Sequence, residues 1–219
     1  MTLEKVFKSL GVDANTLTAE EKKSLDELGY VILHDLLPAE DIGKIASLID
    51  KCKALKDGYG NLLNHDPVFE QCVTNPRLLA CAIHVLGLEI KYGVLNCNKV
   101  MPGKDRQALH IDSKKGTSPG NWTVINSVWF IDEFTKENGA TRLVPKTHLI
   151  GKHANNILED AKADHPDQIQ AVGPAGSAVV FNAYTWHSAM SNTTNAPRVH
   201  CIRLLTGGIG NSSWINGKP

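Results

Sequence analysis

The 219-residue sequence contains few cysteines, and no two of them have the CxxC spacing of a zinc site or a redox motif. The five that are present are odd in number and scattered, at positions 52, 72, 81, 97 and 201. This pattern argues against a disulfide framework, and it is typical of a compartment that keeps thiols reduced. We therefore expect a cytoplasmic protein.

The sequence also lacks any long apolar run and any excess of charge of one sign. The longest apolar stretches, such as residues 78–83, are far shorter than the about 20 residues that cross a bilayer. The first residues are charged and form no apolar signal segment. Because 23 basic residues balance 23 acidic ones, neither nucleic acid nor an anionic membrane is indicated as a partner.

No internal repeat and no linker rich in proline, glycine and serine divides the chain, so we expect one domain over residues 1–219. Residues 1–89 are predicted to be mostly helical, and Thr18 and Glu21 have the spacing of a capping box. Residues 90–206 form a series of short β-branched runs separated by turns. This order predicts helices packed on a sandwich or barrel of strands. The expected helices begin near residues 18, 38 and 75, a polar helical insertion is expected at residues 155–163, and the expected strands cover residues 30–33, 90–101, 124–134, 177–182 and 198–206.

A histidine and an aspartate, His110 and Asp112, stand two residues apart behind the first long predicted strand. In extended backbone alternate side chains share a face, so the imidazole and the carboxylate converge on one point. With one more histidine from a distant strand they would form the two-histidine, one-carboxylate face that leaves positions open on non-haem iron. The alternative is a solvated turn. His165 and Asp167 have the same spacing, but a proline separates them in a polar stretch, and we expect no metal there.

The candidate for the third ligand is His187, at the start of a strand near the C-terminus. A polar turn follows, and Arg198, eleven residues later, begins the next predicted strand. This arrangement would place both side chains in one cavity. A planar guanidinium can hold a carboxylate through two parallel hydrogen bonds, which suits the distal carboxylate of 2-oxoglutarate while the other end of the keto acid chelates the metal.

With these residues in order, the sequence resembles the phytanoyl-CoA dioxygenase branch of the iron(II)- and 2-oxoglutarate-dependent oxygenases, over roughly residues 90–206. The resemblance implies a double-stranded β-helix, or jelly roll, with N-terminal helices packed on one sheet and Fe(II) held by His110, Asp112 and His187. It also implies that 2-oxoglutarate and O2 are used to hydroxylate or desaturate a substrate, with release of succinate and carbon dioxide. The matching stretches are residues 110–112, residues 137–148, His187 with Asn192 and Arg198, and, earlier in the chain, residues 29–31.

Further residues are candidates for contacts with the co-substrate. Trp129 lies on the central predicted strand, where the family has an aromatic residue that touches 2-oxoglutarate. Asn98 lies on the strand that leads to the metal site, and its amide could bind the keto acid; an amide satisfied by backbone is an equal alternative. Many relatives have a serine two residues after the distal histidine, where this chain has Ala189. We expect Ser188, or else Thr185 or a tyrosine, to supply that contact.

For two other histidines and one loop, a purely structural role is also considered. The resemblance implies a structural part for His148, and His200 is expected to be a satisfied core histidine although it alternates with Arg198 on one strand. Residues 113–116, directly after Asp112, are a candidate substrate lid, with a solvated loop as the alternative.

The sequence favours some reactions over others but does not select a substrate. Asp112 favours oxygen insertion or desaturation, because related halogenases have a small residue in its place. One alternative is a cupin-like protein that binds metal and small acids without oxidising them, and Arg198 argues against it. Another is a zinc hydrolase with an activated water, for which the sequence offers no obvious general base. Since the fold does not select the substrate, we expect only a small molecule, handled by a monomer or a homodimer.

Overall fold

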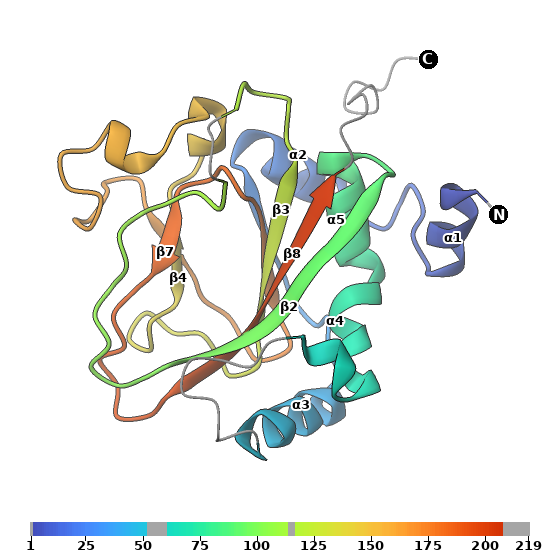
Figure 1. The fold of residues 1–219 in the computed structure, drawn as a ribbon, viewed down its shortest axis with the longest axis horizontal. Helices are drawn as coiled ribbons and strands as arrows, with labels where there is room; N and C mark the ends of the chain where they lie inside the picture. The colour runs from blue at the N-terminus through green and yellow to red at the C-terminus, as the bar shows by residue number, and fades with distance from the viewer. Residues whose placement is uncertain (1, 52–60, 114–116, 208–219) are drawn as a thin grey trace.

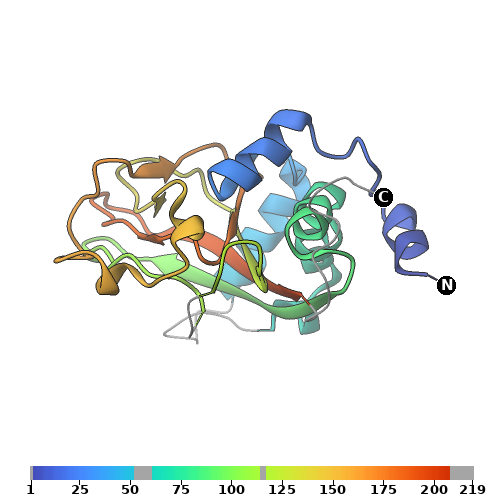
Figure 2. The ribbon, with the colours of Figure 1, turned by 90° about the horizontal axis from the view of Figure 1, so that it is seen from above.

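In a computed structural model, which describes residues 2–51, 61–113 and 117–207, two antiparallel sheets face each other and helices cover the larger one (Figures 1 and 2). The larger sheet has the strand order β1-β6-β3-β8-β2, and the smaller sheet has the order β5-β4-β7. The larger sheet consists of β1 (Tyr30–Leu33), β2 (Ile90–Val100), β3 (Val124–Phe130), β6 (Ala178–Asn182) and β8 (Arg198–Gly207), and the smaller of β4 (Thr141–Leu143), β5 (Ile169–Ala171) and β7 (His187–Ala189).

The N-terminal helices begin at residues whose side chains satisfy free backbone N–H groups. Thr18 and Glu21 make the expected reciprocal capping box. The side chain of Asn75 accepts hydrogen bonds from the backbone of the following turn, with Pro76 at the first helical position. The α-helices are α1 (Leu3–Ser9), α2 (Ala19–Glu27), α3 (Ala39–Lys51), α4 (Gln71–Thr74) and α5 (Pro76–Leu86), and the 3-10 helices are η1 (Leu62–Asn64), η2 (Pro67–Glu70), η3 (Thr147–Ile150) and η4 (Ala154–Asn156).

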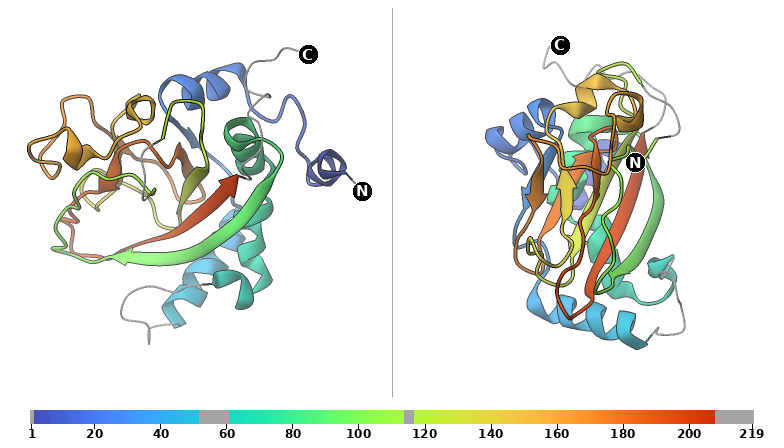
Figure 3. Two further views of the ribbon diagram at one scale, coloured as in Figure 1. Left: turned by 45° about the horizontal axis from the view of Figure 1, so that its top comes forward. Right: turned by 90° about the vertical axis from the view of Figure 1, so that its left-hand side faces the viewer.

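Each strand of the larger sheet contributes alternate residues to two cores, because successive side chains point to opposite faces. The core on the helix side joins the sheet to α3 and α5, and it includes Ile45, Cys81 and Trp129. The core on the other side fills the space between the two sheets, which we call the lumen. Figure 3 shows the helices on the far side of the larger sheet from this space. The lumen is lined by Val128, Phe130, Phe134, Leu143, Val179 and Phe181.

A further extended segment, residues 103–112, continues the smaller sheet beyond β7. The backbone N–H of Gln107 donates to the carbonyl of Ala189 at 2.9 Å, and His110 and His187 exchange two backbone hydrogen bonds of 3.0 Å. Leu109 and Ile111 are buried on the outer face of this segment. The chain therefore brings the residues around His110 directly beside the start of β7.

The five strands of the larger sheet lie at their expected positions within a few residues. The three strands of the smaller sheet have three residues each. Of these, only β7, which begins at His187, was expected. The helical insertion predicted at residues 155–163 is wrong: among these residues only the end of η4 is helical, and turns follow. One cause is local competition, since the Asp160 side chain accepts a hydrogen bond from the backbone of Lys162. Within the described residues no helix has the length and apolarity needed to cross a membrane. Most of the expected lid, residues 114–116, lies outside them.

Candidate metal centre

Three side chains of the types that can bind metals converge at one end of the lumen. The candidate ligand atoms of His110, Asp112 and His187 all lie within 4.8 Å of one another. Nε2 of His187 is 3.2 Å from Oδ2 of Asp112, and Nε2 of His110 is 3.7 Å from Oδ1 of the same carboxylate. In the part of the chain that the structure describes, no other three His, Cys, Asp or Glu side chains form such a group. His165 and Asp167, the second pair with this spacing, therefore have no third partner there.

Alternation along two adjacent extended segments directs these ligands into the lumen. Leu109 and Ile111 are buried in an outer apolar cluster with Trp186. The side chains of His110 and Asp112, which alternate with these residues, therefore point into the lumen. The side chain of His187, next to Trp186, does the same. The paired backbones of residues 110 and 187 then bring the two imidazole rings to a centroid separation of 4.5 Å.

The hydrogen bonds of both candidate histidines leave Nε2 as the nitrogen that can bind a metal. Nδ1 of His110 lies 2.9 Å from the carbonyl of Ala108, and Nδ1 of His187 lies 2.8 Å from the carbonyl of Thr185. A carbonyl can only accept, so each Nδ1 carries a proton, and in the neutral form of each ring the lone pair lies on Nε2. Both lone pairs face Asp112. A backbone carbonyl on the remote nitrogen is a common partner of metal-bound histidine.

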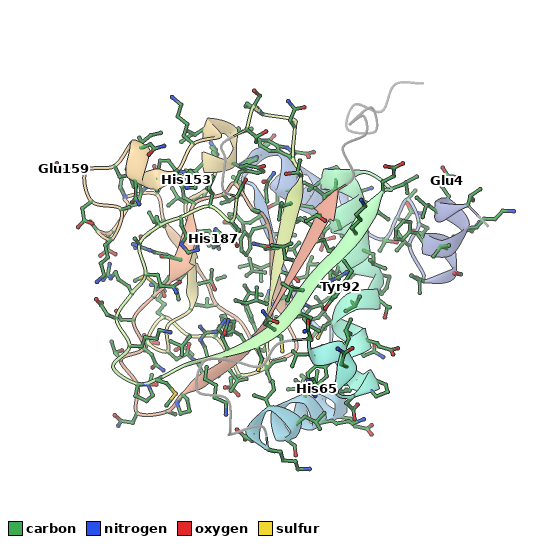
Figure 4. The ribbon with its side chains drawn as sticks, viewed as in Figure 1. Glu4, His65, Tyr92, His153, Glu159 and His187 are labelled. Carbon is green, nitrogen blue, oxygen red and sulfur yellow. The ribbon has the colours of Figure 1, made fainter. Side chains whose placement is uncertain are left out.

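Metal ligands must be deprotonated, and the pKa shifts of His110 and Asp112 are both in the direction that favours this. Burial lowers the pKa of His110, and repulsion from His187 and His153 lowers it further. His153 lies in the loop after η3, above His187 in the view of Figure 4. Burial alone would raise the pKa of Asp112, but hydrogen bonding to His187, attraction by both histidines and a hydrogen bond donated by the amide of Asn126 lower it overall. The Asp112 carboxylate is therefore ionised, and the His110 imidazole loses its proton more readily than a free imidazole.

Arg198, the expected co-substrate residue, lies at the start of β8 with 1% of its surface exposed. Its Nε and Nη2 donate to the carbonyls of Asn138 and Gly139 at 3.1 and 2.7 Å, and its guanidinium lies 3.7 Å from the centre of the Phe134 ring. Burial lowers its pKa to about 9, and the charge of Asp132 opposes that shift. Its Nη1 is buried and has no hydrogen-bond partner. This free donor fits an anion that enters the lumen.

Asn98 shares the lumen face with Arg198. It lies on β2 directly opposite His200, and Val100, two residues further along β2, lies opposite Arg198. Cross-strand partners project from the same face of a sheet. The Nδ1 atom of His200 is also buried without a partner, so this end of the lumen contains two unsatisfied polar atoms.

The structure places Trp129 away from the lumen, contrary to our expectation. Trp129 is fully buried in the core between the larger sheet and the helices. Asn126, three residues earlier on β3, reaches Asp112 and therefore marks the opposite face. The aromatic ring cannot touch a ligand in the lumen, and we leave it out of the proposed site.

The two hydroxyls expected to replace the missing serine are engaged elsewhere. Ser188 projects from the outer face of β7, where its Oγ accepts a 2.7 Å hydrogen bond from Nε of Arg142. The Thr185 hydroxyl donates to the carbonyl of Gly29 at 3.1 Å. Neither side chain is available beside Ala189.

The residue that sequence reasoning missed is Thr141. It is the direct partner of Ala189 across β4 and β7, just as Leu143 is the partner of His187. Its side chain therefore projects from the same face as the lumen-facing His187. Thr141 stands inside the family-like segment, but only the register reveals which residue it opposes.

The comparisons with known proteins agree with this architecture. The family model "Phytanoyl-CoA dioxygenase (PhyH)" matches residues 25–200, which is most of the chain. The chain belongs to the phytanoyl-CoA dioxygenase family. This is a family of 2-oxoglutarate-dependent non-haem iron dioxygenases, the class that the sequence predicts.

The individual relatives and structural neighbours have low sequence identity to this chain. "Dioxygenase af480" of Aspergillus fumigatus is 30% identical over 82% of the chain, which spans only 63% of that relative's length. Ectoine dioxygenase of Bordetella parapertussis is 22% identical over 89% of the chain and 77% of its own. The crystal structure of EctD from S. alaskensis with 2-oxoglutarate and 5-hydroxyectoine has a TM-score of 0.73 at 18% identity, covering 88% of this chain and 77% of EctD. HygX from Streptomyces hygroscopicus with nickel and 2-oxoglutarate has a TM-score of 0.73 at 13% identity, covering 92% and 94%. These likenesses confirm the expected jelly-roll fold.

Proposed function

We propose that this protein is an Fe(II)- and 2-oxoglutarate-dependent dioxygenase, with the metal bound by His110, Asp112 and His187. The observation that carries the proposal is the convergence of two Nε2 atoms, each in a ring whose Nδ1 is bound to a carbonyl, and one carboxylate at the lumen. Two nitrogens and one oxygen on one side of a metal leave its other positions free for a co-substrate and O2. A closed structural zinc site would need a fourth protein ligand, and the described residues offer none.

The lumen supports the co-substrate part of the proposal. Arg198 has no carboxylate partner in hydrogen-bond contact, and one of its buried N–H groups is free. A buried charge is costly until it is paired, so a bound dicarboxylate would offset part of the desolvation of Arg198. We assign the distal carboxylate of 2-oxoglutarate to Arg198, with the hydroxyl of Thr141 as the second contact and Asn98 facing the same space. In this class the bound iron, with 2-oxoglutarate and O2, supplies oxidative decarboxylation to succinate and carbon dioxide coupled to oxidation of the substrate.

The remaining residues of the site orient the ligands and exclude water. Asn126, itself 1% exposed, donates to Oδ2 of Asp112 and so fixes the rotation of that carboxylate. The ring of Phe181 packs on His187 with a centroid distance of 4.5 Å. Phe130 and Phe134 stack on each other deeper in the lumen, near Arg198. Apolar walls of this kind strengthen the electrostatic contacts of a bound keto acid.

The exposure of the ligands indicates from which side a substrate would approach. The side chain of His110 is 40% exposed and that of Asp112 is 33% exposed, whereas that of His187 is 7% exposed. The centre is therefore open to solvent on the side of residues 110–112 and closed on the side of β7. We propose a small-molecule substrate that enters there. The names of relatives such as ectoine dioxygenase are consistent with small substrates.

The proposal is tested by oxygen-dependent conversion of 2-oxoglutarate to succinate, with Fe(II) and a library of candidate metabolites. We expect a subset of metabolites to stimulate succinate formation in the natural protein, and His110→Ala and Asp112→Ala to abolish the stimulated rate. Asp167→Ala removes the carboxylate of the second HxD pair and should leave the rate unchanged. Full activity of both ligand variants would contradict the metal assignment, and turnover with zinc in the absence of O2 would favour a hydrolase instead.

A further inference from the structure

The most extensively bonded side chain in the described structure lies outside the lumen. Arg142, on β4, has no exposed surface and projects from the outer face of the smaller sheet. Among the described residues, the one carboxylate within 4 Å of its guanidinium is that of Asp164, at 3.8 Å and with a side chain that is 64% exposed. The guanidinium is instead surrounded by neutral acceptors. They are Oγ of Ser188 at 2.7 Å, Oε1 of Gln168 at 3.0 Å, and the carbonyls of Gln107, Ala161, Lys162 and Ala163 at 3.1, 3.2, 3.3 and 2.8 Å.

These acceptors belong to three segments that are far apart in the sequence. Gln107 lies three residues before His110, in the extended segment that carries the first two candidate ligands. Ser188 follows His187 directly on β7. The carbonyls of residues 161–163 belong to the loop that replaces the expected helix. One guanidinium therefore ties both ligand-bearing segments to each other and to this loop.

The loop in turn supports the first ligand segment a second time. The backbone N–H of Leu109, the residue before His110, donates to the carbonyl of Ala161 at 2.8 Å. Ala161 is buried in the same outer cluster as Leu109. Its carbonyl also accepts from Arg142. Loss of the guanidinium would remove the donor that four carbonyls share, and the carbonyl of Ala161 would keep only its bond from Leu109.

We propose that Arg142 is a positioning residue for the metal centre, which fixes the separation between the segments of His110 and His187 from the outer face of the sheet. This inference rests on the proposed function, because it assumes that these histidines bind the metal. A methionine could fill the same volume, but it could not link the segments. A lysine has the charge but not the planar fork that reaches several acceptors at once.

The test compares Arg142→Met and Arg142→Lys with Arg203→Met. Arg203 is a matched control, since it is also a buried arginine on a strand, 2% exposed, but it donates to the carbonyl of Cys72 on the helix side of the larger sheet. Fe(II) affinity is measured without oxygen in the presence of 2-oxoglutarate, from the charge-transfer absorption of the chelate. The thermal unfolding of each metal-free variant is recorded separately, so that lost stability is not mistaken for lost affinity.

We expect Fe(II) affinity to fall about 10- to 100-fold in Arg142→Met, which is the usual effect of removing a partner behind a metal ligand. Arg142→Lys should recover only a small part of this loss. Arg203→Met should lower the unfolding temperature but keep the affinity of the natural protein. An affinity within twofold of the natural protein in folded Arg142→Met would overturn the inference.

A milder variant keeps the inference testable if Arg142→Met does not fold. Ser188→Ala removes one hydrogen bond to Arg142 and leaves the others in place, and we expect about fivefold weaker Fe(II) binding. Unchanged binding in Ser188→Ala, with no folded Arg142 variant to set against it, would also count against the inference. Absence of any Fe(II) chelate in the natural protein is a different result, because it would contradict the proposed function itself.

Discussion

Thr141 and Ala189 face each other across β4 and β7, and this pairing decides which hydroxyl can reach a ligand in the lumen. We expect Thr141→Val, which keeps the side-chain shape and removes the hydroxyl, to raise the KM for 2-oxoglutarate about fivefold, the effect of one lost hydrogen bond. The measurement is succinate formation against 2-oxoglutarate concentration. Thr185→Val is the control, because its hydroxyl is bound to Gly29; it should lower stability and leave this KM unchanged. An unchanged KM in Thr141→Val would remove Thr141 from the proposed site.

At the same scale, the sequence predicts a side chain's role well only where its immediate neighbours determine its direction. His110 and Asp112 could be placed on one face because alternation is a local property of extended chain. Trp129 and Ser188 could not be placed correctly, because the answer depends on which face of a strand meets the helices and which meets the other sheet. Thr141 depends on strand register, which involves residues almost fifty positions apart.

Among the elements, the junction between α2 and β1 is held against the segment before His187 by a glycine. Gly29 has a φ of +85°, and a Cβ atom there would lie 2.5 Å from both Nδ1 of His148 and Oγ1 of Thr185. Both neighbours are buried and cannot move aside. Gly29→Ala should therefore lower the free energy of unfolding by about 3 kcal/mol, combining backbone strain with overpacking. Denaturant unfolding of the metal-free protein measures this change.

Gly120→Ala is the matched control for that prediction. Gly120 has a similar φ of +87°, but a Cβ atom there would meet open space. We expect a loss of only about 1 kcal/mol, from backbone strain alone. Equal losses in the two variants would show that close packing at the junction does not matter.

How well an element could be predicted depends on its length and on the origin of its contacts. The strands of the larger sheet contain runs of β-branched and aromatic residues, and their alternation is visible in the sequence. β4, β5 and β7 have three residues each, too few for a periodic pattern, and they exist because neighbouring backbones pair with them. The loop at residues 157–168 is not helical, in part because Arg142 takes three of its carbonyls.

Across the whole molecule, the cores link the helical part to the sheets. The larger core combines residues of α3 and α5 with residues of β2, β3 and β8. Removing residues 1–89 would expose this face and would also take away the edge strand β1. We therefore retain the proposal that the chain is a single domain, which predicts that neither part folds alone.

The buried histidines predict how the stability of the whole protein depends on pH. Burial lowers the pKa of His148, and burial with repulsion from Arg198 and Lys104 holds the pKa of His200 well below its usual range. Both residues are neutral when folded, whereas in the unfolded chain they take up a proton near pH 6.5. Their stabilising contribution is thus complete above that pH and is lost as the pH falls. We expect the free energy of unfolding of the metal-free protein to drop between pH 7.5 and 5.5.

The variant that checks this origin is His148→Gln, whose amide can still donate to the carbonyl of Asp26, the partner of His148 Nε2. The unfolding free energy of this variant should fall less steeply over the same range. Its slope should differ from that of the natural protein by up to about 1.4 kcal/mol for each pH unit below 6.5. Asp112 does not interfere, because its lowered pKa affects stability only in more acidic solution. Identical slopes for both proteins would show that His148 is not responsible.

We propose that three side chains hold iron while Arg198 holds the keto acid in the same lumen. The most direct test is to add Fe(II) and then 2-oxoglutarate to the metal-free protein without oxygen and to record the visible spectrum. We predict the weak charge-transfer band of an iron-bound keto acid, its loss in Asp112→Ala and in His187→Ala, and a requirement for much more 2-oxoglutarate in Arg198→Ala. Absence of the band in the natural protein, or an unchanged band in the ligand variants, would contradict the account.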